Sequence, residues 1–333
     1  MMAAQPPGKK DISVVWQHHA RPADEIELVV TLPTFKRPEH LRTTLRSVVA
    51  QSTNTPYAIV VMDNHADAAE GAAAAQKLLA EEDISATVIL AHRRGNCAAY
   101  NAGFHTALTT YPNARWIQII DDDEIAHPDW LEKQIAVAEN CGADFCGAPQ
   151  HPIFDGGQHQ DWQNHPVFQP PFHTTGPVPI LYSSGNVLIS TKRLRHHQHP
   201  WLDEVFNFLG GGDSDFFSRC KADGATFAWC SEAGVDESTP LRRTELSWLN
   251  SRSLRNGSIS ALIQKRAAGS ALDHIKRIVK SCLLLAASPY RSLILFVNKG
   301  SLIMALNPMN VALGRLLMEF GFANEQYRAA DKN

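Results

Sequence analysis

Residues 116–130 read WIQIIDDDEIAHPDW. The apolar run that ends at Ile120 has the length of a buried strand, and it is followed at once by Asp121, Asp122, Asp123 and Glu124. Carboxylates this close repel one another, which raises their pKa values unless a cation neutralises the group. Oxygen ligands favour hard cations such as Mg²⁺ or Mn²⁺ over zinc. The stretch therefore predicts a strand that ends in a cation-binding loop, with a solvated acidic loop as the alternative.

The rest of the first half repeats this pattern of an apolar strand followed by a helix. Apolar runs of strand length occupy residues 26–32, 57–64, 86–91 and 115–120. Segments with helical spacing or composition lie between and after them, at residues 38–51, 68–80, 96–110 and 128–140. Four such repeats predict the α/β class, with a mostly parallel central sheet and helices on both faces. Two further strands are expected at residues 185–190 and 225–230, with a short helix within residues 210–224 between them.

Three polar clusters follow three of the predicted strands. They are LPTFKRP at residues 32–38, MDN at residues 62–64 and the carboxylates at residues 121–124. Because ligands of such sheets bind outside the carboxyl ends of the strands, we expect these clusters to share one edge. Asp63 is suited to holding a ribose or a base, and a turn or cap residue is the equal alternative.

The distribution of charge separates the body of the chain from its C-terminal part. The 333 residues are 44% hydrophobic and 20% charged, as in an ordinary soluble globular protein, and the net charge is −3. Residues 241–300 hold eleven Lys and Arg but two acids, which gives +9 there and leaves −12 elsewhere. An acidic body with a basic tail suggests a partner or surface for the tail. The six cysteines show no zinc-finger or CxxC spacing and are expected to be reduced thiols.

Five segments together resemble a known family. VVTLPTFKRPEHLRTTLRSVVAQ, VVMDN, GNCAAYNAG, IIDDDE and GGGDSDFF come in the order found in family-two glycosyltransferases of the GT-A fold. The sequence is most similar to bacterial exopolysaccharide glucosyltransferases of the succinoglycan type, over residues 26–257. The resemblance implies a GT-A nucleotide-sugar-binding domain at residues 25–243, between a polar segment at 1–24 and a helical extension at 244–333.

The resemblance also implies which residues bind the donor. Those that match the family's nucleotide-sugar positions are Pro33, Thr34, Phe35, Arg37, Asp63, Gly95, Asn101, Asp121 and Asp122. Asp63 corresponds to the acid that contacts the uracil or ribose. Tyr100 stands where many members have arginine, so the diphosphate contacts there are expected to differ.

Metal ligands and a base are implied in the same way. Asp121 and Asp123 match the acids of the D-x-D motif, which bind Mn²⁺ or Mg²⁺, with Asp123 as the direct ligand. Asp236 stands at the place of a further ligand, and Glu237 is the neighbouring candidate.

Asp213 falls on the family's catalytic base. It follows Gly212, which replaces the usual glutamate. One base without a second nucleophile implies a single displacement with inversion. A helix cap is the plain alternative for an aspartate after a glycine turn.

The C-terminal extension is expected to be basic and amphipathic. Its longest uncharged run, from Ser281 to Tyr290, is too short to span a bilayer, and Pro289 and Arg291 interrupt the next apolar stretch. Helices lying on the anionic inner face of the cell membrane fit better, which makes the protein cytoplasmic and peripheral. The alternative is that the helices pack on the rest of the protein and the basic residues are solvated.

The resulting functional expectation is an inverting, metal-dependent glycosyltransferase of cell-surface glycan biosynthesis. Its donor would be a nucleotide-sugar, with UDP favoured by family frequency, and its acceptor a lipid-linked glycan or polysaccharide; no nucleic-acid partner is expected. Gly212 and Asp236 keep open a catalytically silent, membrane-associated nucleotide-sugar-binding protein. A nucleotidyltransferase would share the metal and phosphate chemistry, but the chain lacks a glycine-rich pyrophosphorylase signature at its N-terminus.

Overall fold

The computed structural model describes residues 11–155, 160–197 and 199–321. The chain divides into two compact units. The first comprises Met1–His151 and Pro170–Glu237, and the second comprises Pro152–Gln169 and Ser238–Asn333. This division differs from the expected boundary at residue 243, because a segment expected to lie within the catalytic domain belongs to the second unit.

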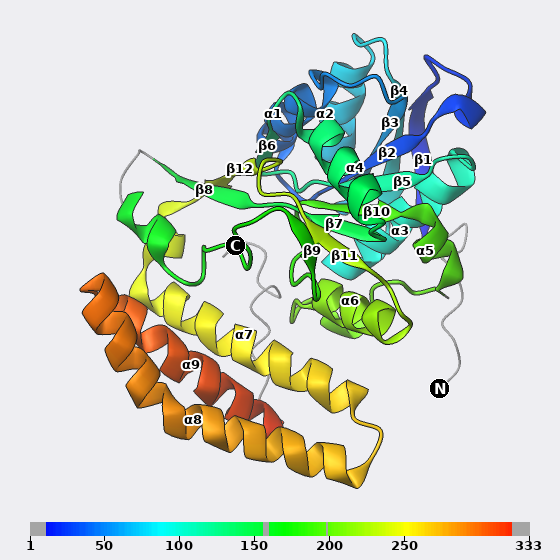
Figure 1. Cartoon of the computed structure of the whole chain (residues 1–333). Coiled ribbons are helices and arrows are strands. Elements are labelled where there is room, and N and C mark those ends of the chain that lie inside the picture. The colour runs from blue at the N-terminus through cyan, green and yellow to red at the C-terminus, as the bar shows by residue number, and fades with distance from the viewer. Residues whose placement is uncertain (1–10, 156–159, 198, 322–333) are drawn as a thin grey trace. The chain divides into compact units, whose positions relative to one another are not determined.

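The first unit is built on one large sheet. Within the described residues it has nine strands in the order β1-β4-β3-β2-β5-β10-β7-β11-β9 (Figure 1). Their bounds are β1 (Ile12–His18), β2 (Leu28–Thr34), β3 (Tyr57–Asp63), β4 (Ser85–Ala91), β5 (Trp116–Ile119), β7 (Phe145–Gly147), β9 (Gly176–Val178), β10 (Val187–Ser190) and β11 (Phe227–Trp229). The strands β4, β3, β2 and β5 are parallel, as predicted, and β10 is antiparallel to both β5 and β7.

Strand β1 was not expected, since residues 1–24 were predicted to be a loosely attached polar segment. It pairs antiparallel with β4 at the edge of the sheet. Val14 and Val15 are exposed there, so the strand lacks the continuous apolar run that marks a buried strand. Residues 1–10 of the same predicted segment lie outside the described residues.

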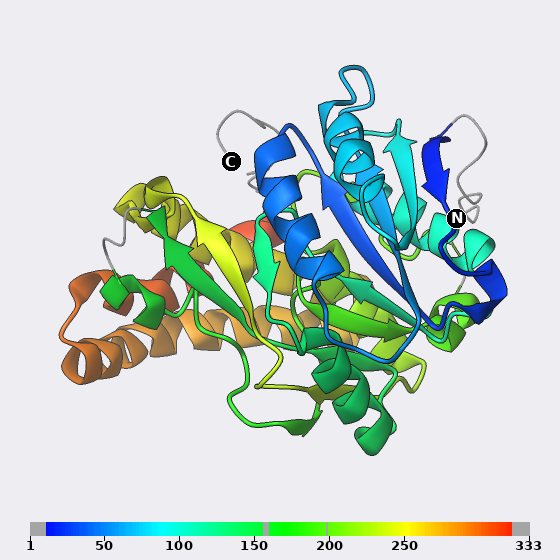
Figure 2. The ribbon, with the colours of Figure 1, turned by 90° about the horizontal axis from the view of Figure 1, so that it is seen from above.

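Helices cover both faces of the sheet, as predicted. Their bounds are α1 (Pro38–Val49), α2 (Glu70–Leu79), α3 (Asn96–Thr110), α4 (Trp130–Cys141), α5 (Thr191–His196) and α6 (Gly212–Ala222). One core cluster joins α1, α2 and α4 to alternate residues of β2 and β3, and α1 and α2 lie side by side (Figures 1 and 2). Helix α3 packs against β2 and β3. A Cβ on Gly103 would come within 2.6 Å of Met62, so glycine allows this close approach.

A second sheet holds the strands β6 (Glu124–Ala126), β12 (Val235–Thr239) and β8 (Gln150–Phe154), in the order β6-β12-β8. Strand β6 begins at the last of the four carboxylates. It pairs antiparallel with β12, so that Glu124 faces Glu237 and Ile125 faces Asp236. Residues 149–179 were expected to be a long irregular excursion, but they contain β8, the 3₁₀ helix Gln160–Asn164 and β9.

The second unit contains the helices α7 (Leu246–Ala267), α8 (Ala271–Lys299) and α9 (Leu302–Glu319). Helix α8 runs unbroken through Pro289. Proline removes the N–H that would bond the carbonyl four residues earlier. Here the Ser288 hydroxyl donates to the Leu285 carbonyl at 2.7 Å and satisfies that oxygen. Among the described residues, α8 is the one helix long and apolar enough to cross a membrane by length and composition.

Candidate active site

The candidate site lies at the carboxyl ends of the parallel strands. Thr34 at the end of β2 is in register with Asp63 at the end of β3, and Thr31 is in register with Ile119 of β5. The three predicted polar clusters therefore occupy one edge of the sheet, as the alternation of strands and helices implied.

Asp122 connects the loop that follows β2 to residues 121–124, which we call the acidic loop. The Thr34 hydroxyl donates to its Oδ2 at 2.7 Å, and the Thr44 hydroxyl of α1 donates to its backbone carbonyl at 2.9 Å. The residue is 7% exposed. Asp122 is thus a buried brace between β2 and β5, a role that its place in a run of four acids does not reveal.

Arg37 lies over the acidic loop. Its Nη1 is 2.8 Å from Asp123 Oδ2 and 3.5 Å from Asp122 Oδ1. The Asp123 side chain is 10% exposed, so this charge-assisted contact is largely shielded from water. The Arg37 guanidinium therefore places a positive charge beside Asp123 in the structure.

Asp121 is held from the opposite side by Tyr100, which is 1% exposed. The Tyr100 hydroxyl donates to Asp121 Oδ1. The Asp121 backbone N–H donates to Glu124 Oε2 at 2.9 Å, and Gln150 donates to the other Glu124 oxygen. The tyrosine that stands in place of the family's arginine thus donates a hydrogen bond directly to the first carboxylate of the D-x-D motif.

Three carboxyl groups of the acidic loop have raised pKa values. Burial, and then the charge on Asp123, raise the pKa of Asp121 to about 7 and that of Asp122 to about 6. Burial and the charge on Asp121 hold the pKa of Glu124 well above its usual range. A set of oxygen ligands whose pKa values are raised by burial and mutual repulsion suits a hard divalent cation.

The ligand count bears on how such a cation would be held. Within the described ranges, no three His, Cys, Asp or Glu side chains are grouped as a ready metal cage. Mg²⁺ usually takes one or two carboxylates and completes its coordination with water and substrate phosphates. Asp121 and Asp123 would supply the two carboxylates.

Asp213 lies in the first turn of α6. Its Oδ2 accepts from the Ser184 backbone N–H at 3.0 Å and from the Ser184 hydroxyl at 3.4 Å. The N-cap of α6 is Gly211, with no side-chain cap bond, so Asp213 is not the helix cap of the alternative reading. The charges on Asp121 and Asp213 both contribute to the raised pKa of Tyr100, so both carboxylates act on the same buried phenol.

The structure gives a packing reason for Gly212. A Cβ at this position would come 2.5 Å from Cys97 Sγ at the start of α3. The glutamate that most members carry here has no room beside Cys97. The buried Cys97 thiol therefore occupies the space that a side chain at residue 212 would need.

Three of the predicted donor residues have structural partners. Asp63 is 0% exposed, and its two oxygens accept from the backbone N–H groups of His65 and Ala72, at 2.9 and 2.8 Å. Asn101 holds both backbone groups of Leu202. Gly95 has a φ of +131°, and a side chain there would meet Asn207. Their contacts fix the loops around the site, and their predicted contacts with donor remain predictions.

Phe35 and Pro33 complete the first loop. Pro33 is buried in β2, opposite Met62. The partly exposed Phe35 ring has His65 edge-on at 5.3 Å, and the Arg94 guanidinium lies 5.1 Å from its centroid. The loop therefore presents an aromatic face and basic groups together, near the ends of β2 and β4.

The further metal ligand was expected at Asp236. Successive side chains of a strand point to opposite faces, and Asp236 pairs with the exposed Ile125. Its carboxylate lies 3.5 Å from His127. Glu237 pairs with buried Glu124, and its charge raises the pKa of Asp121. The geometry favours Glu237, the neighbouring candidate, over Asp236.

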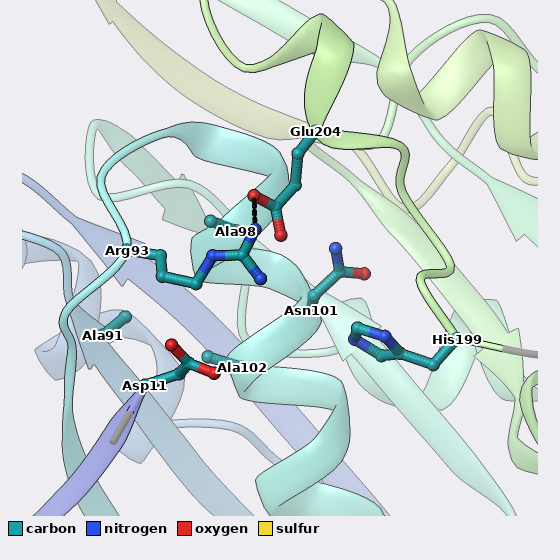
Figure 3. Close-up of a pocket in the computed structure, with 8 residues that line it drawn as sticks. All are labelled: Asp11, Ala91, Arg93, Ala98, Asn101, Ala102, His199 and Glu204. Carbon is teal, nitrogen blue, oxygen red and sulfur yellow. Dashed lines mark hydrogen bonds and ion pairs between the residues drawn. The ribbon is translucent and has the colours of Figure 1, made fainter. Parts of the chain in front are cut away.

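A separate small cavity lies on the flank of α3. It is lined by Asp11, Ala91, Arg93, Ala98, Asn101, Ala102, His199 and Glu204 (Figure 3). Arg93 and Glu204 form an ion pair beside it. None of the four carboxylates of residues 121–124 lines this cavity, so it is distinct from the sheet edge that carries them, which we call the acidic edge.

Sequence reasoning missed the residues that hold these groups in place. Ser184, Gln150 and Glu204 contact site loops from segments 26 to 111 residues away in the chain. Single serines and glutamines in irregular segments carry no periodic signal, so only the fold reveals them.

A mostly parallel sheet with an acidic loop at the carboxyl ends of its strands is the arrangement expected of the GT-A class. Residues 29–198 match the family Glycosyl transferase family 2, and the chain belongs to this family. It is therefore a glycosyltransferase.

The chain is similar to two known proteins. It is 27% identical over 259 residues to the succinoglycan biosynthesis protein ExoM of Rhizobium meliloti (strain 1021), which covers 74% of this chain and 79% of that protein. Among solved structures it is similar to the mannosyltransferase PcManGT from Pyrobaculum calidifontis in complex with GDP-Man and Mn²⁺. That match has a TM-score of 0.55 and 15% identity, over 87% of each chain. The structural likeness confirms the GT-A fold.

Proposed function

We propose that this protein is an inverting, metal-dependent glycosyltransferase. It would move a sugar from a nucleotide-sugar, with a UDP-sugar as the expected donor, to a lipid-linked or polysaccharide acceptor. The observation that carries the proposal is the acidic edge. There Asp121 and Asp123 follow β5 at the carboxyl ends of the parallel strands, and Asp121 accepts a hydrogen bond from the buried Tyr100. The relationship to ExoM, a succinoglycan biosynthesis protein, supports cell-surface glycan synthesis.

The donor would bind across the loops at the ends of β2, β3 and β5. Asp121 and Asp123 would hold Mn²⁺ or Mg²⁺, with Glu237 close by. When bound, such an ion offsets the charge that develops on the departing nucleoside diphosphate. Arg37, now 2.8 Å from Asp123, would turn its guanidinium toward a donor phosphate oxygen. The Phe35 face offers a stacking surface for the base.

Asp213 would act as the general base. Two backbone N–H groups and a hydroxyl donate hydrogen bonds to its carboxylate, which keeps it oriented. As the acceptor hydroxyl attacks C1, its proton passes to an Asp213 oxygen. The bond from C1 to the nucleotide oxygen breaks on the opposite face. A single displacement of this kind inverts the anomeric centre.

The second unit supports the proposed acceptor and location. Its helices expose apolar side chains beside lysines and arginines. Such surfaces suit the anionic inner face of a cell membrane, where a lipid-linked glycan would be presented. We therefore propose a cytoplasmic protein bound peripherally to that face.

The test is release of nucleoside diphosphate. Purified full-length protein would be incubated with Mn²⁺ and a panel of UDP-, GDP- and dTDP-sugars, first without and then with membrane lipid extract as acceptor. We expect slow release from one donor without acceptor and faster release with it. Asp123→Asn and Asp213→Asn should each lower the rate by about 10²- to 10⁴-fold. Asp129→Asn, an exposed acid paired with Lys133, is the matched control and should leave it unchanged.

The other readings predict different products. Tight Mn²⁺-dependent donor binding without diphosphate release from any donor would identify the catalytically silent binding protein. Gly212, in place of the usual glutamate, is the observation that favours this second candidate. Release of pyrophosphate would identify a nucleotidyltransferase.

A further inference from the structure

The burial pattern of helix α8 is the reverse of that of a surface helix in a soluble protein. Its buried residues are Arg277, Ser281 and Ser288, and most of its large apolar side chains are exposed. A surface helix normally buries its apolar stripe and exposes its polar face. Something other than the second unit's own helices must therefore cover the outward face.

Eight of the exposed apolar residues form one continuous stripe, which we call the outward stripe. They recur every three or four residues, so they share one side of the helix. The members are Leu272, Ile275, Val279, Leu283, Ala286, Tyr290, Leu293 and Val297. Apart from Ala286, each is 49 to 72% exposed. At 1.5 Å per residue the stripe is about 38 Å long.

Basic residues accompany the outward stripe along its length. Lys276, Lys280, Arg291 and Lys299 are exposed on α8, and Asp273 is its single acid. Lys276 and Lys280 are one turn apart and directly follow members of the stripe. An apolar line bordered by cations matches an anionic lipid surface, with acyl chains below and phosphates beside it.

The inward face of α8 packs against α9. Helix α9 lies between α7 and α8 (Figure 1). The buried Arg277 forms an ion pair with Glu319 at the end of α9. Bringing α8 across a bilayer would carry Arg291 into the hydrocarbon, at a high cost in desolvation. The helix therefore has one face for lipid and one for protein, which is the condition of a helix lying in the membrane plane.

We propose that the outward stripe of α8 is a docking surface that lies flat in the interface of an anionic bilayer. This deepens the membrane placement given under the proposed function by naming the surface, its orientation and the lipid charge. It does not depend on the transfer reaction.

Vesicle flotation of the full-length protein tests the proposal. We expect binding to vesicles of equal parts phosphatidylcholine and phosphatidylglycerol, and at least tenfold weaker binding to phosphatidylcholine alone. The double variant Leu283→Glu and Leu293→Glu should bind the anionic vesicles at least tenfold less. Its matched control, Val14→Glu and Val205→Glu, adds the same charge at exposed positions outside the stripe and should bind like the unchanged protein.

Three results would overturn the proposal: no binding to either vesicle, equal binding by the stripe variant and the control, or protein that resists extraction by alkaline carbonate. The last would mean that α8 spans the bilayer. Nucleoside diphosphate release measured without vesicles separates this test from the proposed function. A stripe variant that keeps its release rate is folded, and loss of flotation alone then reports on docking.

Discussion

Tyr100 shows how one residue can change role within a family pattern. Where many members have an arginine, this chain has a buried phenol that donates to Asp121. Burial and the charge on Asp121 keep its pKa well above 10, so the hydroxyl stays protonated and remains a donor. A neutral donor orients the carboxylate without cancelling the negative charge that would attract a divalent cation.

Replacing this hydroxyl tests that role. In Tyr100→Phe, Asp121 loses a buried hydrogen bond, worth about 1 kcal/mol. We expect the Mn²⁺ concentration for half-maximal nucleoside diphosphate release to rise about fivefold, because Asp121 is less well oriented. Tyr111→Phe is the control, since Tyr111 is also buried but bonds Thr87. An equal change in both variants would mean that the effect is general loosening.

At the scale of elements, the parallel half of the large sheet was predictable and its margins were not. Continuous apolar runs mark β2, β3, β4 and β5, and the predicted helix 96–110 matches α3. The edge strand β1 and the short strands β8 and β9 carry weak patterns, because part of each faces water or an irregular loop. Their pairing is set by distant partners, which local periodicity does not report.

Helix packing in the second unit depends on two glycines. A Cβ on Gly314 of α9 would lie 1.9 Å from the Leu254 carbonyl of α7, and one on Gly257 would lie 2.0 Å from the Val311 carbonyl. Both obstacles are backbone, so no side chain can turn aside. The two helices approach closely only because both positions lack a side chain.

The substitution Gly314→Ala should therefore separate α7 from α9. We expect a loss of about 1–3 kcal/mol in the stability of the second unit, as for overpacking elsewhere. Amide hydrogen exchange of both helices would measure it. Gly269→Ala is the matched control, since a Cβ there meets nothing within 4 Å. Unchanged exchange in Gly314→Ala would contradict the packing argument.

For the whole molecule, the sequence indicates the class of site better than it indicates the contacts of each residue in that site. The order of the polar clusters along one sheet edge follows from strand alternation, and the acidic quartet indicates its chemistry. The separate structural roles of the four acids cannot be predicted from the sequence. Asp122 braces two strands, Glu124 accepts from the Asp121 backbone, and Asp123 meets Arg37. Those roles depend on partners from α1, α3 and β8 that only the folded chain brings together.

The quartet also couples metal binding to global stability. Folding raises the pKa of Asp121 to about 7 and that of Asp122 to about 6, above the value of about 4 expected in the unfolded chain. The folded state then holds protons that the unfolded state has released. This contribution to stability is full below about pH 4 and is lost as the pH rises through 6 and 7.

A divalent cation should offset that loss where the carboxylates are ionised. We expect Mn²⁺ to raise the melting temperature more at pH 7.5 than at pH 5, because protons compete for the same oxygens at the lower pH. Differential scanning fluorimetry with and without Mn²⁺ at each pH measures this. Asp123→Asn should abolish most of the shift at pH 7.5, whereas Asp129→Asn should retain it. Equal Mn²⁺ shifts at both pH values would show that the ion binds elsewhere, and the acidic edge would then lose its role as the metal site.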